Sequence, residues 1–155
     1  MKVLGIDPGN YSTGYSIVKG EGNKYTVLTY GSIKSKNRPE NLRRIFQRLQ
    51  EVINQFSPDE MALESAFYGK NPQSLLRLGE VRGVILLLSS MNSIPLYEYT
   101  PQKVKNSITG YGWSGKNEVF MMVEKLLNVK PENHDEADAI AVAFCHLLSR
   151  RLNIG

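Results

Sequence analysis

The alternation of hydrophobic and polar residues along the chain predicts five strands and five helices. The segments rich in β-forming residues are 2–7, 14–18, 25–33, 59–64 and 94–99. The segments with apolar residues at helical spacing are 39–56, 73–91, 116–127 and 133–152. We expect the loop 20–23 to join the second and third strands as a hairpin. Thr100-Pro101 pairs a capping residue with a proline at the first helical position, which predicts a short additional helix.

This order of elements indicates a mixed five-stranded sheet with helices on its faces, an α/β fold. The three leading strands are joined by short turns and should pair antiparallel, whereas the two later strands alternate with helices and should join in parallel. The length of 155 residues is typical of one domain, residues 1–155. The 73–91 helix is apolar nearly all round after Val81, which predicts that its C-terminal half is buried on more than one side.

Composition narrows the classes of protein that fit. The single cysteine, Cys145, excludes an internal disulfide and a zinc cluster of cysteines. The longest strongly apolar run, Val84–Leu88, is far shorter than the roughly 20 residues that span a bilayer. The N-terminus has one lysine and then an acid at Asp7, unlike a signal peptide. We therefore expect a cytoplasmic protein that does not contact a membrane.

Basic residues gather in three segments that hold almost no acid. The net charge is only +4, yet segment 34–50 holds six basic residues against Glu40 alone. Segments 66–79 and 99–117 hold five basic residues and no acid. A surface of this kind attracts a polyanion such as nucleic acid. A merely solubilising surface is the alternative interpretation.

Four acids lie where strands end or a helix begins. Asp7 and Glu64 each follow a short apolar strand, and Asp135 and Asp138 lie three residues apart at the start of the last helix, on one of its faces. A buried carboxylate without a partner costs several kcal/mol, and a divalent cation offsets that cost. Oxygen ligands without histidine or cysteine favour Mg²⁺ or Mn²⁺ over zinc.

Acids within a basic surround are the arrangement expected of a nuclease. Two ions about 3.5–4 Å apart activate a water and stabilise the leaving oxygen of a phosphodiester. Each acid also has a simpler explanation when it is considered alone. Asp135 complements the helix dipole, Asp7 caps the Pro-Gly turn, and Glu64 by itself indicates little.

Six motifs, in order along nearly the whole chain, resemble the RuvC family of Holliday-junction resolvases. They are Gly-Ile-Asp-Pro-Gly-x-x-x-Thr-Gly-Tyr at 5–15, Ala-Leu-Glu-x-x-Phe at 62–67, Ser-Leu-Leu-Arg-Leu-Gly-Glu-Val-Arg-Gly-Val at 74–84, Tyr-Glu-Tyr-x-Pro-x-x-Val-Lys at 97–105, Gly-x-Gly-x-x-x-Lys at 110–116 and Asp-x-Ala-Asp-Ala-x-Ala-x-Ala at 135–143. The resemblance implies an RNase H-like fold and a homodimer. It also implies Mg²⁺-dependent, paired nicking of four-way junction DNA in recombination and repair, with two ions per site and Mn²⁺ as a substitute. The RuvAB branch-migration complex is an implied partner.

The resemblance also assigns roles to single residues. The family's four catalytic, metal-binding acids carry over to the four acids named above, Asp7, Glu64, Asp135 and Asp138. Some relatives have a histidine at the third position, but here that residue is Asp135. We interpret the neighbouring His134 as an exposed residue at the helix start.

The implied DNA contacts come from basic and aromatic residues. Two family lysines near the junction carry over to Lys105 and Lys116, and the aromatic residue beside the exchange point carries over to Phe67. Tyr68, Lys70 and Arg77 extend this DNA-binding set. Ordinary helix surface is the alternative for Lys105, and core packing is the alternative for Phe67.

Three other interpretations remain open at this point. The string Asp-x-Gly-x-x-x-Thr-Gly at 7–14 also resembles the phosphate loop of actin-like ATPases, which need a second lobe for which 155 residues give no room. A junction-binding scaffold without chemistry would not need all four acids. A YqgF-like nuclease of the same fold would act on RNA instead of DNA.

Overall fold

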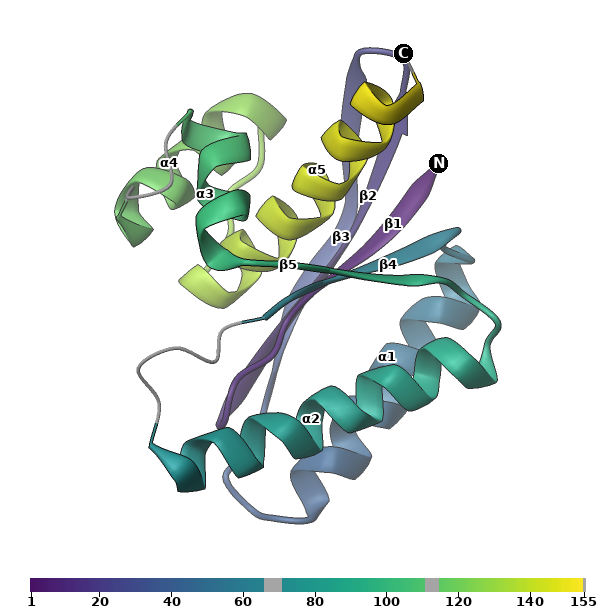
Figure 1. The fold of residues 1–155 in the computed structure, drawn as a ribbon, viewed down its shortest axis with the longest axis vertical. Coiled ribbons are helices and arrows are strands. Elements are labelled where there is room, and N and C mark those ends of the chain that lie inside the picture. The colour runs from purple at the N-terminus through teal and green to yellow at the C-terminus, as the bar shows by residue number, and fades with distance from the viewer. Residues whose placement is uncertain (66–70, 111–114, 155) are drawn as a thin grey trace.

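A five-stranded sheet lies between two layers of helices in the computed structural model, which describes residues 1–65, 71–110 and 115–154 (Figure 1). The strands are β1 (Lys2–Asp7), β2 (Ser12–Glu21), β3 (Lys24–Lys34), β4 (Glu60–Glu64) and β5 (Leu96–Tyr99). Their spatial order is β3-β2-β1-β4-β5. The pairs β1–β2 and β2–β3 are antiparallel, and β4 is parallel to both β1 and β5. The predicted mixed sheet is confirmed.

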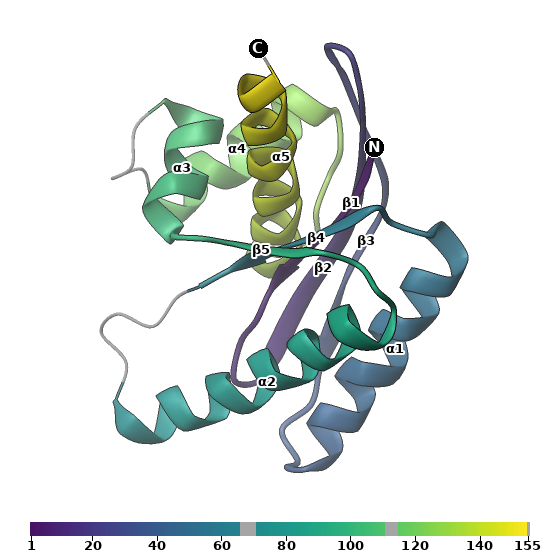
Figure 2. The same ribbon diagram turned by 45° about the vertical axis from the view of Figure 1, so that its right-hand side comes forward.

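The helices divide between the two faces of the sheet. One face is covered by α1 (Glu40–Phe56) and α2 (Pro72–Met91), and the other by α3 (Pro101–Thr109), α4 (Lys116–Leu127) and α5 (His134–Ile154) (Figure 2). The helix α5 lies along β1 and β2. Across the described ranges, none of the helices combines the length and apolarity needed to cross a membrane.

Alternation along β1 and β4 determines which side chains face α5. Val3 packs in the core under α5, whereas Leu4 and Ile6 pack in the core under α1 and α2. In β4, Ala62 faces α5, and Met61 and Leu63 face the opposite side. Because side chains alternate with a period of two, the last residue of each strand, Asp7 or Glu64, also faces α5.

Side-chain caps begin the helices that flank the end of the sheet. The Thr100 hydroxyl accepts a hydrogen bond from the Lys103 amide (3.2 Å), as the sequence predicts for the start of α3. The Asn133 side-chain oxygen accepts a hydrogen bond from the Glu136 amide (3.0 Å) and caps α5. The first turns of α3 and α5, which these caps begin, lie at the same end of the sheet.

Two expectations about these elements need correction. Strand β2 continues to Glu21 and strand β3 begins at Lys24. Only Gly22-Asn23 therefore forms the hairpin loop, instead of the predicted residues 20–23. The residue Gly22 adopts a φ of 59°, which closes a two-residue turn and lets the pairing continue to its ends.

The C-terminal half of α2 is buried on one side only. Its buried residues are Val81, Ile85 and Leu88, whereas Leu87 is 52% exposed and Met91 is 61% exposed. The prediction of burial on several sides is therefore wrong for the single chain. The reason is that α2 packs against α1 and the sheet along one face, and its opposite apolar face lies on the surface.

Candidate active site

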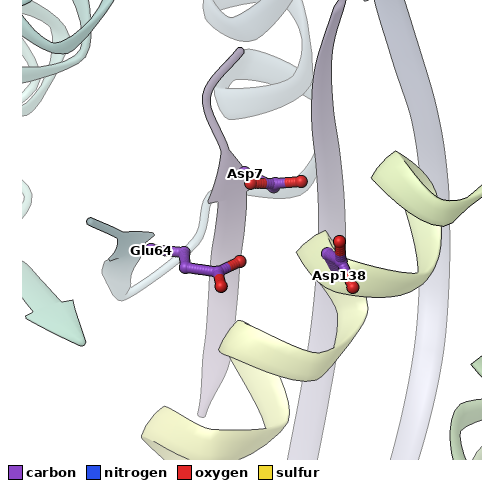
Figure 3. A group of neighbouring side chains, drawn as sticks. All are labelled: Asp7, Glu64 and Asp138. Atoms are coloured by element: carbon purple, nitrogen blue, oxygen red, sulfur yellow. The ribbon is translucent and has the colours of Figure 1, made fainter. Parts of the chain in front are cut away.

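Three carboxylates meet where β1 and β4 end (Figure 3). Asp7 ends β1, Glu64 ends the neighbouring parallel strand β4, and Asp138 extends from the start of α5 toward both. One carboxylate oxygen from each residue lies within 4.8 Å of the other two. The sequence predicted each acid at an element boundary, and the fold brings these three to metal-binding distance of one another.

Two glycines allow α5 to approach the sheet closely enough for this meeting. A Cβ added at Gly5 would lie 2.3 Å from the Ala139 carbonyl oxygen, and one added at Gly14 would lie 2.0 Å from the Asp135 carbonyl oxygen. The Ser16 hydroxyl also donates a hydrogen bond to the Ala139 carbonyl (2.9 Å). The backbone at the start of α5 therefore lies directly on β1 and β2.

The three acids line one wall of a cavity of about 410 Å³. Asp135, the fourth predicted acid, also lines this cavity, outside the three-carboxylate group. The predicted lysines, Lys105 on α3 and Lys116 at the first position of α4, lie on its other walls. The sequence assigned no role in the site's chemistry to the remaining lining residues, which are Pro8, Gly9, Asn10, Leu78, Pro101, Val104 and Val119.

Burial, together with the charges of neighbouring acids, raises the pKa of all three clustered acids. Burial is the main cause that raises the pKa of Asp7 well above its ordinary value, and the charge of Glu64 is the second. For Glu64, burial is again the main cause and the charge of Asp138 the second, and together they raise the pKa to about 7. Burial also raises the pKa of Asp138 to about 6, and Lys116 partly opposes this shift. The site is therefore unfavourable for three carboxylate charges without a cation.

The donor set fits a divalent cation of the Mg²⁺ or Mn²⁺ type. The three side chains offer only carboxylate oxygens, which are the ligands that these ions prefer. A bound cation replaces the repulsion among the carboxylates with attraction and so relieves the cost of burying them.

His134 is half-buried, not exposed as the sequence interpretation expected. Its ring packs edge-on against Phe120, with centroids 5.4 Å apart. Its Nδ1 is buried and has no hydrogen-bond partner among the described residues. His134 is the first residue of α5, and Asp138 follows it by four residues on the same helix face, so its ring lies beside the site.

The other predicted DNA contacts either are not among the residues that line the cavity or fall outside the described residues. Arg77 is on α2, where its Nη1 donates a hydrogen bond to the Tyr11 hydroxyl (3.2 Å). Tyr11 is 56% exposed, and the sequence interpretation overlooked it because it occupies an unspecified position inside the 5–15 motif. Phe67, Tyr68 and Lys70 fall in the segment 66–70, outside the described residues.

Comparison with known proteins relates this arrangement to a single family. Residues 3–146 match the family model described as crossover junction endodeoxyribonuclease RuvC. The RuvC protein of Halothermothrix orenii is 42% identical over 99% of this chain and 96% of its own length. That of Thermosipho melanesiensis is 44% identical over 97% of this chain and 99% of its own.

Solved structures give the same result for the fold. Thermus thermophilus RuvC in complex with Holliday junction substrate superposes with a TM-score of 0.92 at 31% identity, covering 99% of this chain and 96% of that chain. A yeast mitochondrial Holliday junction resolvase, at 17% identity and a TM-score of 0.64, covering 98% of this chain and 83% of its own, shares the fold alone. The predicted RNase H-like architecture is thus confirmed.

Proposed function

The chain belongs to the RuvC family of crossover junction endodeoxyribonucleases, and from this premise we propose that it resolves Holliday junctions by paired, metal-dependent nicking of DNA strands. The observation that carries the proposal is the group of Asp7, Glu64 and Asp138, held within 4.8 Å in a cavity that also contains two lysines. Clustered acids suit metal-assisted phosphodiester hydrolysis, and adjacent cations suit a polyanionic substrate.

We assign the metal ligands to the acids of the cavity. Asp7, Glu64 and Asp138 would hold the ions, with Asp135 completing the set from the cavity wall. The proposal specifies two Mg²⁺ ions per site, with Mn²⁺ as a substitute. Bound ions of this kind supply an activated water and stabilise the leaving oxygen of the phosphodiester.

The basic groups of the cavity are assigned to phosphates that flank the cut. Lys105 and Lys116 line the same cavity as the acids, and their charges oppose the rise in the pKa of Glu64 that burial causes. Lys116 is also the first residue of α4, and the positive end of a helix dipole attracts an anion. Arg77, Phe67, Tyr68 and Lys70 are also proposed to contact the DNA, with Phe67 beside the exchange point and the aromatics stacking on bases.

A homodimer is part of the proposal, because two symmetric cuts need two sites related by a twofold axis. The exposed face of α2 carries Leu76, Gly79, Gly83, Leu86, Leu87 and Met91. A Cβ at either glycine would meet nothing within 4 Å, so a second helix has room to approach closely there. We further propose the RuvAB complex as a partner, and the cytoplasm, where bacterial chromosomal DNA lies, as the compartment.

Substitution of each acid tests the catalytic assignment. We expect Asp7→Asn, Glu64→Gln, Asp135→Asn and Asp138→Asn each to lower the Mg²⁺-dependent nicking rate of a synthetic four-way junction by more than about 100-fold, beyond the loss typical of outer-shell groups. Junction binding should persist, because basic residues supply most of the affinity. A gel assay of nicking and a mobility-shift assay in Ca²⁺ measure the two properties.

A matched control separates a loss of ligands from a general loss of charge. Glu132→Gln removes an exposed acid three residues before Asp135 and should leave the rate unchanged. Full-rate nicking by any one acid variant would remove that residue from the site. Faster cleavage of structured RNA than of junction DNA would replace this function with that of a YqgF-like nuclease.

A further inference from the structure

A buried polar network joins β4 to α5 at the ends of these elements that are distant from the acids. Its centre is Glu60, the first residue of β4, which is 6% exposed. Arg150 of α5 donates to both Glu60 oxygens, with 2.9 Å between Nε and Oε1. His146 of α5, which is 1% exposed, lies 2.7 Å from Oε1 through its Nε2. We call Glu60, His146 and Arg150, with Tyr97 and Tyr99 of β5, the Glu60 network.

The two tyrosines of β5 complete the network. The Tyr99 hydroxyl lies 2.6 Å from Nδ1 of His146, and Arg150 Nη2 donates to the Tyr97 hydroxyl (2.6 Å). The Tyr97 ring stacks on the His146 ring, with centroids 4.7 Å apart. The Tyr99 carbonyl also accepts a hydrogen bond from the Ser65 amide (2.9 Å), directly after Glu64. The network therefore reaches the backbone beside an acid of the site.

One protonation state satisfies these contacts. Burial lowers the pKa of His146, so its imidazole is neutral, accepting from Tyr99 at Nδ1 and donating to Glu60 from Nε2. The hydrogen bond from Arg150 lowers the pKa of Glu60, so this carboxylate is ionised. The network holds one anion and one cation, and its internal hydrogen bonds account for both imidazole nitrogens.

The network and the acids occupy opposite ends of the same two elements. Glu60 and Glu64 share the face of β4 toward α5 and lie about 13 Å apart along the strand. His146 follows Asp138 by eight residues, or about 12 Å along α5. Among the described residues, the hydrogen bonds from α5 side chains to β4 all end on Glu60.

This placement opposes a specific force. One carboxylate oxygen of Glu64 and one of Asp138 lie within 4.8 Å of each other, and two negative charges at this distance repel, which favours a wider spacing between β4 and α5. The close contacts at Gly5, Gly14 and Ser16 hold α5 to β1 and β2, which are different strands. Mg²⁺ accepts little variation around its bond lengths of about 2.0–2.1 Å, so ligand spacing affects its affinity.

We propose that Glu60, His146 and Arg150 are positioning residues that hold β4 and α5 at the spacing at which Glu64 and Asp138 bind a divalent cation. This inference rests on the proposed function for its metal site, but its three residues touch neither metal nor DNA in that proposal. It assigns to the ion pair between buried Glu60 and half-buried Arg150 a role in metal affinity beyond its contribution to folding.

Two variants test the inference. Glu60→Gln removes the charge that Arg150 and His146 contact, and Arg150→Lys keeps the positive charge but loses the two-pronged donor geometry. We expect each to weaken Mn²⁺ binding in calorimetry by about three- to tenfold, less than a group that touches a ligand directly. The Mg²⁺ concentration for half-maximal nicking should rise by the same factor, and saturating Mg²⁺ should restore the rate.

The control breaks a comparable pair elsewhere on the sheet. Glu98→Gln removes the ion pair between β5 and Arg82 of α2, which does not involve α5, and should leave Mn²⁺ affinity unchanged. A lower melting temperature with unchanged Mn²⁺ affinity in both variants would overturn the inference and make the network purely structural. The Arg150 side chain is 38% exposed, so Arg150→Lys should disturb folding less than Glu60→Gln. It remains informative if Glu60→Gln does not fold.

The readouts separate this inference from the proposed function. A wild-type chain that binds Mn²⁺ but does not nick junctions would reject the function, and weaker Mn²⁺ binding by the variants would still support the inference. A wild-type chain that nicks junctions, with variants of unaltered Mn²⁺ affinity, would reject the inference alone.

Discussion

At the scale of single residues, the buried acids make stability depend on pH and on metal. The pKa of Asp7, of Glu64 at about 7 and of Asp138 at about 6 all lie above the ordinary values. A group whose pKa is raised by folding stabilises the fold below its unfolded pKa, and this stability is lost as pH rises through the folded pKa. The metal-free protein should therefore lose stability between about pH 4 and about pH 7 from these groups.

Thermal melting in EDTA and in Mg²⁺ checks this prediction. We expect the melting temperature in EDTA to fall as pH rises through the pKa values of Asp138, about 6, and Glu64, about 7, and Mg²⁺ to raise it most above that range. Asp138→Asn should flatten the profile, and its difference from wild type isolates the acids from other titrating groups such as His146. If the melting temperatures of wild type and Asp138→Asn in EDTA depended on pH in the same way, the assignment of this pH dependence to the acids would be contradicted.

At the scale of elements, the position of α5 depends on the absence of a side chain at Gly14. A Cβ there would lie 2.0 Å from the Asp135 carbonyl oxygen, which is backbone and cannot turn aside. We expect Gly14→Ala to destabilise the fold by about 1–3 kcal/mol, the usual cost of overpacking, and to weaken Mn²⁺ binding because Asp138 shifts with α5. Urea unfolding and calorimetry measure the two effects.

The same strand offers the control for that substitution. A Cβ at Gly20 would meet the side chain of Leu147 at 3.0 Å, near the other end of α5 from the acids. A flexible side chain can move by a few tenths of an ångström, so Gly20→Ala should cost less stability and leave Mn²⁺ binding unchanged. Equal losses of metal affinity in both variants would mean that contact at Gly14 does not determine the position of Asp138.

At the scale of the whole molecule, the exposed apolar face of α2 predicts a dimer. Leu87→Glu places a charge on this face, where burial in an interface without a partner costs several kcal/mol. We expect the dimer dissociation constant to rise by more than about 100-fold, with the fold intact. Sedimentation equilibrium measures the dimer dissociation constant. The control is Met121→Glu on α4, because the native Met121 side chain is as exposed as that of Leu87, at 52%. A wild-type chain that is a fully active monomer would contradict the prediction.

Much of the fold was predictable because its signals are local. Alternation along a strand and three-to-four spacing along a helix depend on neighbours in the sequence, so the mixed sheet, the helix at 116–127 and the start of a short helix at Pro101 agree with expectation. The hairpin was placed less well, since the pairing of Gly20 and Glu21 with β3 depends on register rather than on propensity. The burial of α2 was misjudged because an apolar composition does not tell how many neighbours a helix has.

The sequence by itself determined which residues could carry the chemistry, because Asp7, Glu64 and Asp138 occupy the ends of elements that local patterns identify. Only the tertiary structure decided that their oxygens lie within 4.8 Å of one another, since this depends on how closely α5 rests on β1 and β2. Only the fold, likewise, joins Glu60 to His146 across 86 positions. Contacts between residues so distant along the chain depend on the packing of whole elements, which no local pattern records.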